Sequence, residues 1–349
     1  MDATLDDEPT TGISLYGVQL GRALEALGVR VERLGARQSG EAPRKGLSRT
    51  AWTVGVLPEL LRTRRLYHAL GNFNLPLAPP SSCACVLTVH DLIPLTHPGT
   101  VSPAFRLQFR AWLSRALRIS ARVICVSRHT ERELLERFPE TAGRTRVVHH
   151  GVEHLASVVP DAAAIARVDA LALPEQFVLY AGSLDVRKNV QLLLEAMERL
   201  GPGVCLVLVG QRWFGSGPVE RRLEALMARG HDIRAVGHLP AGVFRELLSR
   251  ATAFAFPSRA EGFGLPPLEA MAAGVPVVSS NAGALAEVCG EAAQLVDPDD
   301  AAGLAEALGA LLASPTERQR WIVRGQAHAA RFTWEAAAQR TLSVYREVL

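Results

Sequence analysis

The sequence predicts an α/β protein of two domains, each built on a parallel sheet. Its 349 residues suit two domains of the usual size of about 150 residues, each with its own core. Short apolar runs with strand character alternate with helical stretches, and they form two successive series. Between the series lies an alanine-rich stretch with a proline at each end, Pro160–Pro174, which we interpret as the passage between the domains.

The first series opens with a predicted helix over 12–27 and a strand over 29–34. The helix is predicted from apolar residues that share one helical face, namely Ile13, Tyr16, Leu20, Leu24 and Leu27. An α/β unit normally has a strand before such a helix, but few residues precede this one, so we expect a truncated start with the first strand mostly missing. Further strands are predicted at Leu66–Leu70, Cys85–His90, Val123–Ser127 and Val147–His149.

The second series supplies the remaining strands. They are predicted at Phe177–Ala181, Val204–Val209, Ile233–Val236, Ala253–Phe256, Val275–Ser279 and Gln294–Val296. A short helix over Pro266–Ala273 is predicted because prolines suit a first helical turn and Gly274 suits the position just past a helix end. The closing helices are expected at about 300–313, 316–331 and 334–348.

Composition and charge favour a globular protein of a reducing compartment. The net charge of +3 is too small to indicate a nucleic-acid partner. The five cysteines are scattered, and Cys83 and Cys85 lack a matching Cys or His pair for zinc. No apolar run of the sequence approaches the roughly 18 residues that a membrane span needs. We therefore expect a cytoplasmic location.

The stretch Ser258–Gly274, SRAEGFGLPPLEAMAAG, is the best candidate for a binding site. It places Glu261 in a loop and Glu269 in the short helix that follows. The first amides of a helix have no partner inside it and lie at the positive end of its dipole. We expect these amides, near 263–265, to bind an anion or sugar hydroxyls.

The sequence gives other enzyme classes little support. Glu41 stands where a phosphate-cradling loop after Gly35 and Gly40 requires lysine, and Gly210, Gly215 and Gly217 do not have dinucleotide-loop spacing, so neither an ATPase nor a dehydrogenase is supported. A glycosidase needs two carboxylates roughly 6.5–9.5 Å apart for inversion, whereas eight helical residues span about 12 Å. The prolines interrupt that helix, so the spacing leaves the glycosidase alternative open.

Several stretches of the sequence carry a resemblance to a known family. They are EGFGLPPLE with the following MAAGVPVVSSNAG and QLVDPDD, LYAGSLDVRKNVQLLLEAM, LTVHDLIPLTHP, and VICVSRHTERELLERF. Together they resemble the retaining GT-B glycosyltransferases of family 4, in the mannosyltransferase-like subgroup. The resemblance runs from about Thr11 to the end of the chain. It implies two Rossmann-like domains with parallel sheets that face an interdomain cleft. The expected acceptor-side domain is 1–165, the nucleotide-sugar domain is 170–333, and 334–349 is a helix that crosses back.

The resemblance assigns roles in the stretch around EGFGLPPLE. Glu269 would bind the ribose hydroxyls of a nucleotide sugar, and Glu261 would hold or polarise the transferred sugar. The amides of Phe263, Gly264 and Leu265 would bind sugar hydroxyls, in agreement with the helix-start argument. The alternative to a binding role for Glu269 is that it is a solvent-exposed helix residue without a function.

Arg187 and Lys188 follow the loop that begins at Gly182, between a strand and a helix. Two cations there would neutralise a diphosphate leaving group, which stabilises the charge that develops in the transition state. The alternative is a solvated basic pair. Many members of that family carry arginine directly after the loop glycine, whereas this chain has Ser183. Two alternatives follow: either Arg187 supplies that charge, or the chain binds the diphosphate more weakly.

Two more positions come from the first domain. His90 and Asp91 end an apolar strand, where open α/β sheets present side chains to a crevice. The resemblance places His90 against the transferred sugar, and the alternative is a buried histidine with Asp91 capping the next turn. Gly12 matches, more loosely, a glycine turn near the diphosphate.

No metal or cofactor is expected. Asp297, Asp299 and Asp300 include a DxD pattern, but we interpret Asp299 or Asp300 as the cap of the following helix. The substrate implied by the resemblance is a GDP- or UDP-sugar, with GDP-mannose as the first choice.

An apolar stripe over 105–117 is ringed by arginines. The stripe is Phe105, Phe109, Trp112, Ala116 and Leu117, and the basic residues are Arg106, Arg110, Arg115, Arg118 and Arg122. We favour a helix packed on its sheet with a solvated basic face. The alternative is peripheral contact with an anionic membrane at the inner face of the cytoplasmic membrane, which would suit a lipid-linked acceptor.

The reaction that the resemblance implies is transfer of a hexosyl group, with retention, to an acceptor hydroxyl of a carbohydrate or a lipid-linked glycan, as in the synthesis of cell-envelope polysaccharide. Two alternatives stay open. One is a nucleotide-sugar-binding accessory protein without catalysis, and the other is a GT-B epimerase that acts on the nucleotide sugar itself.

Overall fold

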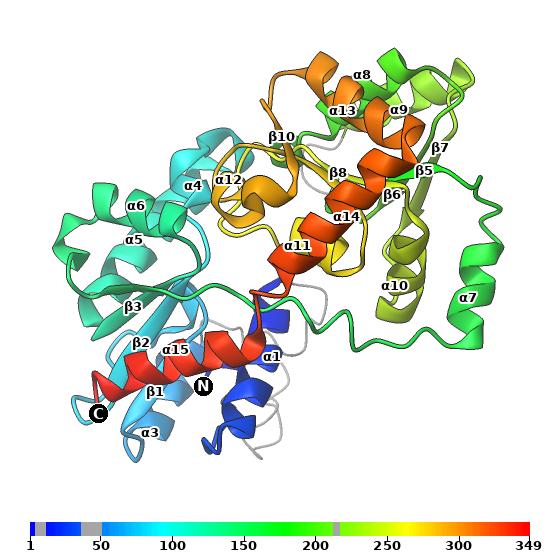
Figure 1. The fold of residues 1–349 in the computed structure, drawn as a ribbon. Helices are drawn as coiled ribbons and strands as arrows, with labels where there is room; N and C mark the ends of the chain where they lie inside the picture. Colours follow the sequence, from blue (N-terminus) through cyan, green and yellow to red (C-terminus); the bar gives the residue numbers. More distant parts are fainter. Residues whose placement is uncertain (4–11, 36–50, 212–216) are drawn as a thin grey trace. The chain divides into compact units, whose positions relative to one another are not determined.

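The fold is described from a computed structural model. It covers residues 1–3, 12–35, 51–211 and 217–349. Gly40, Glu41 and Gly215, which entered the loop comparisons above, lie outside the described residues. The chain divides into two compact units (Figure 1). Unit 1 comprises Met1–Gly151 and Thr333–Leu349, and unit 2 comprises Val152–Phe332.

Unit 1 holds a four-stranded sheet whose spatial order follows the sequence. Its strands are β1 (Leu66–Ala69), β2 (Ala84–Val89), β3 (Arg122–Cys125) and β4 (Thr145–Val147). All of their pairings are parallel, with Leu87 opposite Val123 in the middle of the sheet. The sequence prediction of a parallel sheet is therefore confirmed for this unit.

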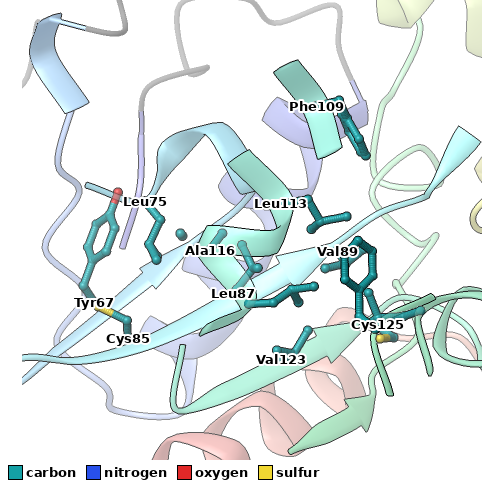
Figure 2. Packing of buried hydrophobic residues seen from close by; sticks show 14 of the residues in the cluster. Tyr67, Leu75, Cys85, Leu87, Val89, Phe109, Leu113, Ala116, Val123 and Cys125 are labelled. Atoms are coloured by element: carbon teal, nitrogen blue, oxygen red, sulfur yellow. The ribbon is translucent and has the colours of Figure 1, made fainter. Parts of the chain in front are cut away.

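Helices cover both faces of this sheet. They are α1 (Gly12–Ala26), α3 (Leu57–Leu61), α4 (Ile93–Thr96), α5 (Pro103–Ile119), α6 (Arg128–Arg137) and α15 (Trp334–Arg346). Neighbouring residues of a strand point to opposite faces. Leu87 packs with Phe109 of α5 in one buried cluster (Figure 2), whereas Val86 packs with Leu20 of α1 and Trp334 of α15 in another.

A buried polar chain ties the C-terminal helix to the sheet of unit 1. The two ring nitrogens of His68 lie 2.7 Å from the Tyr345 hydroxyl on α15 and 2.7 Å from Thr88 Oγ1 on β2. The Tyr16 hydroxyl of α1 lies 3.1 Å from the same Thr88 oxygen. Desolvation by burial lowers the pKa of His68 to about 3, so this ring is neutral and holds α15 in place by hydrogen bonds alone.

The strand expected over 29–34 does not form in the described residues. Leu34 donates to the Met1 carbonyl and accepts from the Ala3 amide, at 2.9 Å each, and the Glu32 carbonyl accepts from the Met1 amino group at 2.7 Å. The Asp2 amide donates to the His68 carbonyl at 3.0 Å, so 1–3 lie between Leu34 and β1. The pattern of alternating apolar residues is present, but in the described residues these bonds make a single β-bridge at Leu34, and a strand requires a continuous ladder.

Unit 2 holds a six-stranded parallel sheet with the order β10-β9-β8-β5-β6-β7. The strands are β5 (Phe177–Ala181), β6 (Cys205–Val209), β7 (Ile233–Gly237), β8 (Ala253–Phe256), β9 (Val277–Ser280) and β10 (Gln294–Val296). Every residue of β5, β6 and β8 is buried, as continuous apolar runs in a sheet covered on both faces should be. The parallel second sheet was also correctly predicted.

The strand order of unit 2 fixes where a ligand can bind. From β5 the chain adds β6 and β7 on one side, and β8, β9 and β10 then follow on the other side. The order therefore reverses between β5 and β8, which are hydrogen-bonded neighbours. In open parallel sheets the connecting helices diverge at such a point, and ligands bind beyond the carboxyl ends of the strands there.

The helices of unit 2 are α7 (Ala162–Asp169), α8 (Val190–Leu200), α9 (Gly217–Ala228), α10 (Ala241–Arg250), α11 (Leu265–Ala272), α12 (Leu285–Cys289), α13 (Ala301–Ala313) and α14 (Pro315–Ala329). The helix predicted over Pro266–Ala273 is α11, and Gly274 follows it with φ of 78°. The passage expected at Pro160–Pro174 contains α7, which packs on α10. Its alanines favour a helix, and Asp161 caps it by accepting from the Ala164 amide at 2.7 Å.

Candidate functional site

The candidate site of unit 2 is built from the loops that leave β5 and β8. The first loop, 182–189, carries Arg187 and Lys188, and the second, 257–264, carries Glu261. Because β5 and β8 are parallel neighbours, both loops start at the same edge of the sheet, at the switch point. The Arg259 amide donates to the Arg187 carbonyl at 2.8 Å, which joins the two loops directly.

Glu261 is the centre of this site. Its Oε1 accepts from Lys188 Nζ at 2.6 Å, from Arg187 Nη1 at 2.9 Å and from Ser258 Oγ at 2.7 Å. The side chains of Lys188 and Glu261 are only 11% and 12% exposed. The structure thus brings together three residues that the sequence prediction named separately, and it adds Ser258, which that prediction missed.

The charges around Glu261 keep it ionised. Burial by itself would raise the pKa of this carboxyl, but the opposite charges of Lys188 and Arg187 and the hydrogen bonds from Lys188 and Ser258 outweigh burial and lower the pKa below its ordinary value of 4.5. At neutral pH the cluster is therefore a carboxylate between two cations. Each cation has more N–H groups than Glu261 uses.

Asp185 organises the loop in which both cations lie. Its carboxylate accepts from the Lys188 amide at 3.0 Å and from Ser183 Oγ at 2.7 Å, and so caps the short 3₁₀ helix Val186–Lys188. Ser183, the residue directly after Gly182, is thus a hydrogen-bond donor within the loop. The helical turn presents Arg187 and Lys188 next to one another, beside Glu261.

Gly182 begins this loop at a point where two backbones meet. A Cβ atom on Gly210, at the end of β6, would lie 1.9 Å from the Gly182 carbonyl oxygen. A Cβ on Gly182 would lie 2.8 Å from the hydroxyl of Tyr180. The contact requires glycine at 210 and favours it at 182, which gives Gly182 a packing role in addition to the predicted donor-binding role.

The start of α11 lies directly after Glu261. Gly264 caps this helix with φ of 100°, and a Cβ there would lie 2.5 Å from Leu285 Cδ2, so glycine is required. Leu265 is the first helical residue. Phe263 is 5% exposed and its ring packs edge-on against Phe332, at 6.0 Å between centroids. The three predicted positions therefore lie together at one helix N-terminus.

Glu269 is not a solvated helix residue. Its Oε1 lies 2.9 Å from Nε2 of His154, and the two side chains are 12% and 9% exposed. His154 precedes Glu269 by more than a hundred residues and follows the first crossing of the chain into unit 2. Sequence reasoning missed His154 because no local pattern marks it.

His90 belongs to unit 1, just after β2. Its Nε2 lies 3.0 Å from the Leu70 carbonyl oxygen, which can only accept, so this nitrogen carries the proton. Its ring meets Tyr16 edge-on at 5.0 Å and stacks on His150 at 5.6 Å. Burial lowers the pKa of His90 to about 4, against the raising effect of the Leu70 carbonyl. His90 is thus a neutral, oriented imidazole.

Two smaller expectations concern Asp91, which follows His90, and Gly12. Asp91 Oδ1 accepts from the Ile93 amide at 3.0 Å, so Asp91 caps the next turn as the alternative reading expected. Gly12, the first residue of α1, is exposed, and a Cβ there would meet no atom within 4 Å. His90 and Gly12 lie in unit 1, and the other predicted site residues lie in unit 2.

The aspartates at 297–300 have structural partners. Asp300 accepts from the Gly303 amide at 2.8 Å and caps α13, as expected for Asp299 or Asp300. Asp299 forms an ion pair with Arg259 at 2.6 Å. In the described part of the chain, no group of three or more His, Cys, Asp or Glu side chains is arranged to hold a metal ion.

The arginine-ringed stripe forms α5, which is partly packed and partly exposed. Phe109, Ala116 and Leu117 lie in the core of unit 1, in agreement with the favoured reading, but Leu107 is 71% exposed. A groove of about 620 Å³ lies beside the exposed half of the helix. It is lined by Leu95, Pro103, Arg106, Leu107, Arg110, Arg137 and Phe138. Within the described ranges no helix is long and apolar enough to span a membrane.

Two family models match the chain. The model for group 1 glycosyl transferases matches 161–328, and the model for glycosyltransferase family 4 matches 10–154. The first range contains the Glu261 cluster and Glu269, and the second contains His90.

The chain is similar to characterised enzymes over most of its length. It is 30% identical to the O-antigen chain mannosyltransferase B of Escherichia coli, over 80% of this chain and 74% of that protein. It is 34% identical to the glycogen synthase of Mycobacterium tuberculosis, over 95% of this chain and 75% of that protein. The crystal structure of Anabaena HepE in complex with UDP has a TM-score of 0.72 and 19% identity, with 97% of each chain covered.

Proposed function

Because the chain belongs to the family 4 glycosyltransferases and has their GT-B fold, we propose that it transfers a hexosyl group from a nucleoside diphosphate sugar to an acceptor hydroxyl, with retention at the anomeric carbon. The observation that carries this proposal is the buried cluster of Glu261, Arg187 and Lys188 at the switch point of unit 2. A diphosphate bears negative charge that increases as the sugar leaves, and the two cations are already held beside the carboxylate before any ligand binds.

We assign the roles as follows. Arg187 and Lys188 bind and neutralise the diphosphate, and Glu261 both orients these cations and holds the transferred sugar. The amides of Phe263, Gly264 and Leu265 donate to sugar hydroxyls at the start of α11. Glu269 accepts hydrogen bonds from the ribose. Gly182 allows the loop after β5 to approach the diphosphate.

Two residues of unit 1, His90 and Gly12, also have roles in this proposal. His90 contacts the transferred sugar with a neutral ring whose Nε2–H is engaged by the Leu70 carbonyl, so Nδ1 is its acceptor atom. We assign Gly12, at the start of α1, a role near the diphosphate. In the proposed front-face reaction a leaving phosphate oxygen takes the acceptor's proton, and the protein positions the groups and stabilises charge.

For the donor we propose GDP-mannose, which the similarity to a mannosyltransferase supports. A glucosyl donor is the second candidate, because the chain is also similar to a glycogen synthase and its fold is that of a protein crystallised with UDP. No metal or cofactor is included in this scheme. We place the acceptor among the carbohydrate or lipid-linked hydroxyls of glycan synthesis.

A thermal-shift screen followed by turnover with labelled donor tests this function. Ligands that bind only the native state raise its stability with the logarithm of their concentration over Kd, so GDP-mannose, UDP-glucose and ADP-glucose can be ranked directly. Incubation of the best donor with candidate acceptors should give transferred label. Isomerised donor would instead indicate an epimerase, and binding without turnover would indicate an accessory protein.

A further inference from the structure

His154 and Glu269 form a buried pair that the reaction scheme above leaves unexplained. His154 Nε2 lies 2.9 Å from Glu269 Oε1, and both side chains are nearly inaccessible to solvent. A buried carboxylate without a partner is strongly disfavoured, so a donor is needed at this position. That donor comes from a distant loop and not from α11 itself.

The loop that carries His154 is held on both sides. On one side, the Val152 amide donates to the Phe332 carbonyl at 3.1 Å and to the carboxylate of Glu153 at 3.0 Å. On the other side, Ser157 Oγ donates to the His154 carbonyl at 2.8 Å. The imidazole therefore reaches Glu269 from a fixed backbone, and it fixes the direction of the carboxylate.

The bond occupies one oxygen of Glu269 and leaves the other for a ligand. A carboxylate offers about four lone-pair positions, of which the His154 bond takes one, on Oε1. No hydrogen bond from the described residues reaches Oε2. A ribose presents two neighbouring hydroxyls. A carboxylate binds them well only if the orientation of its plane is fixed before the ribose binds.

We propose that His154 is a positioning residue for nucleotide recognition, which orients the Glu269 carboxylate toward the ribose hydroxyls and so sets the preference for ribonucleotide donors. This inference rests on the proposed function of Glu269. Without His154 the glutamate side chain would have to be ordered on binding, which weakens affinity by about tenfold, the factor that about 1.4 kcal/mol represents.

The test uses the purified full-length chain and isothermal titration with UDP, GDP and ADP. The nucleotide that binds most tightly is then compared with its form without the two ribose hydroxyls. His154→Phe keeps a buried planar ring but has no N–H donor. We expect it to bind the ribonucleotide about tenfold more weakly and the form without hydroxyls almost as well as the original chain. His154→Gln, which can still donate, should recover most of the discrimination.

Kinetics and a matched variant separate positioning from folding. With sugar nucleotide as substrate, His154→Phe should raise KM with little change in kcat, because ribose binding precedes the transition state. His231→Phe, the same change at a buried histidine of the turn before β7, should leave nucleotide affinity unaltered. In the double variant His154→Phe,Glu269→Gln the two losses of nucleotide affinity should not add, because both substitutions remove the same hydrogen bond.

Two outcomes would overturn the inference in distinguishable ways. If the unaltered chain binds none of UDP, GDP and ADP, the proposed function and this inference both fail. If it binds one of them but His154→Phe shows the same affinity and the same discrimination, the proposed function stands and His154 serves only to attach its loop to α11.

Discussion

One carboxylate oxygen in the candidate site accepts from three side chains at once. Glu261 Oε1 lies within 2.9 Å of Lys188 Nζ, Arg187 Nη1 and Ser258 Oγ. Ion pairs on the surface contribute little to stability, but the side chains of Lys188 and Glu261 are nearly buried. Removal of either one would leave the other charge unpaired in a poorly solvated place. The arrangement keeps two cations adjacent and oriented, which suits a doubly charged leaving group.

At this scale the first prediction concerns Lys188. A charge-assisted hydrogen bond contributes about 1.5–3 kcal/mol, so Lys188→Ala should lower turnover at least about tenfold if the bond to the diphosphate strengthens in the transition state. The measurement is initial rate with labelled donor. Arg222→Ala, which removes a cation paired with Glu198 on the helices of unit 2, is the matched control and should keep its rate. Near-normal turnover of Lys188→Ala would remove this residue from the diphosphate site.

The second prediction at this scale concerns pH. The pKa of Glu261 is lowered in the folded state, so its ionised form stabilises the fold above the ordinary value of 4.5, and that stabilisation is lost as pH falls through the lower folded value. Urea unfolding midpoints measured from pH 5 downward should therefore decrease more steeply for the unaltered chain than for Glu261→Gln. Equal slopes would show that the carboxylate does not titrate with folding.

Among the elements, the ends of β5 and β6 set the position of the whole cation-bearing loop. Gly182 and Gly210 bring their backbones so close that a side chain at 210 has no space. The Gly182 amide donates to the Val209 carbonyl and the Gly210 amide to the Gly237 carbonyl, both at 2.9 Å, so the strands continue to pair as they reach this contact. The loop with Asp185, Arg187 and Lys188 starts from it.

We predict that Gly210→Ala destabilises unit 2 strongly. The added Cβ would meet backbone atoms of Gly182, and φ of 145° at this position is one that side chains disfavour. Overpacking costs about 1–3 kcal/mol, and we expect the upper end of this range because the Cβ would meet backbone atoms, which cannot move aside as a side chain can. Gly203→Ala, where a Cβ meets nothing within 4 Å, should change stability little. Chemical denaturation of the two variants compares them, and equal stability would mean that β5 and β6 separate freely at their ends.

For the molecule as a whole, the two units present different chemistry. Unit 2 gathers charged groups in a nearly buried cluster, whereas α5 of unit 1 combines an exposed Leu107 with a groove lined by Arg106, Arg110 and Arg137. Such a surface combines apolar contact with attraction for anionic headgroups. We therefore propose that this surface of unit 1 contacts an anionic membrane.

The prediction at this scale is a charge-dependent association with vesicles. Co-sedimentation with vesicles that contain anionic phosphatidylglycerol should decrease several-fold in Arg106→Gln,Arg110→Gln, since each basic residue near such a surface contributes about 1 kcal/mol. Arg118→Gln,Arg132→Gln removes the same charge from unit 1 outside the groove and should bind like the original chain. If both double variants behave alike, the groove has no special role at a membrane.

The sequence by itself determined the two parallel sheets and the residues at the switch point. Continuous apolar runs mark strands covered on both faces, and helical stripes mark their crossovers, so each pattern is local and readable. Arg187, Lys188 and Glu261 could be named because each lies in a loop between a predicted strand and a predicted helix, and because the surrounding motifs resemble a known family. The short helix α11 was predicted within one residue, because its prolines and Gly274 are strong local signals.

Only the tertiary structure decided which of these groups touch and what holds them. The sharing of Glu261 Oε1, the bond from His154 to Glu269 and the contact of Gly182 with Gly210 each join residues far apart in the sequence. The missing strand over 29–34 has the same origin, since a strand depends on a partner that its own residues do not specify. Local patterns are fixed by neighbouring residues, whereas hydrogen-bond partners and close approaches are fixed by the packing of distant ones.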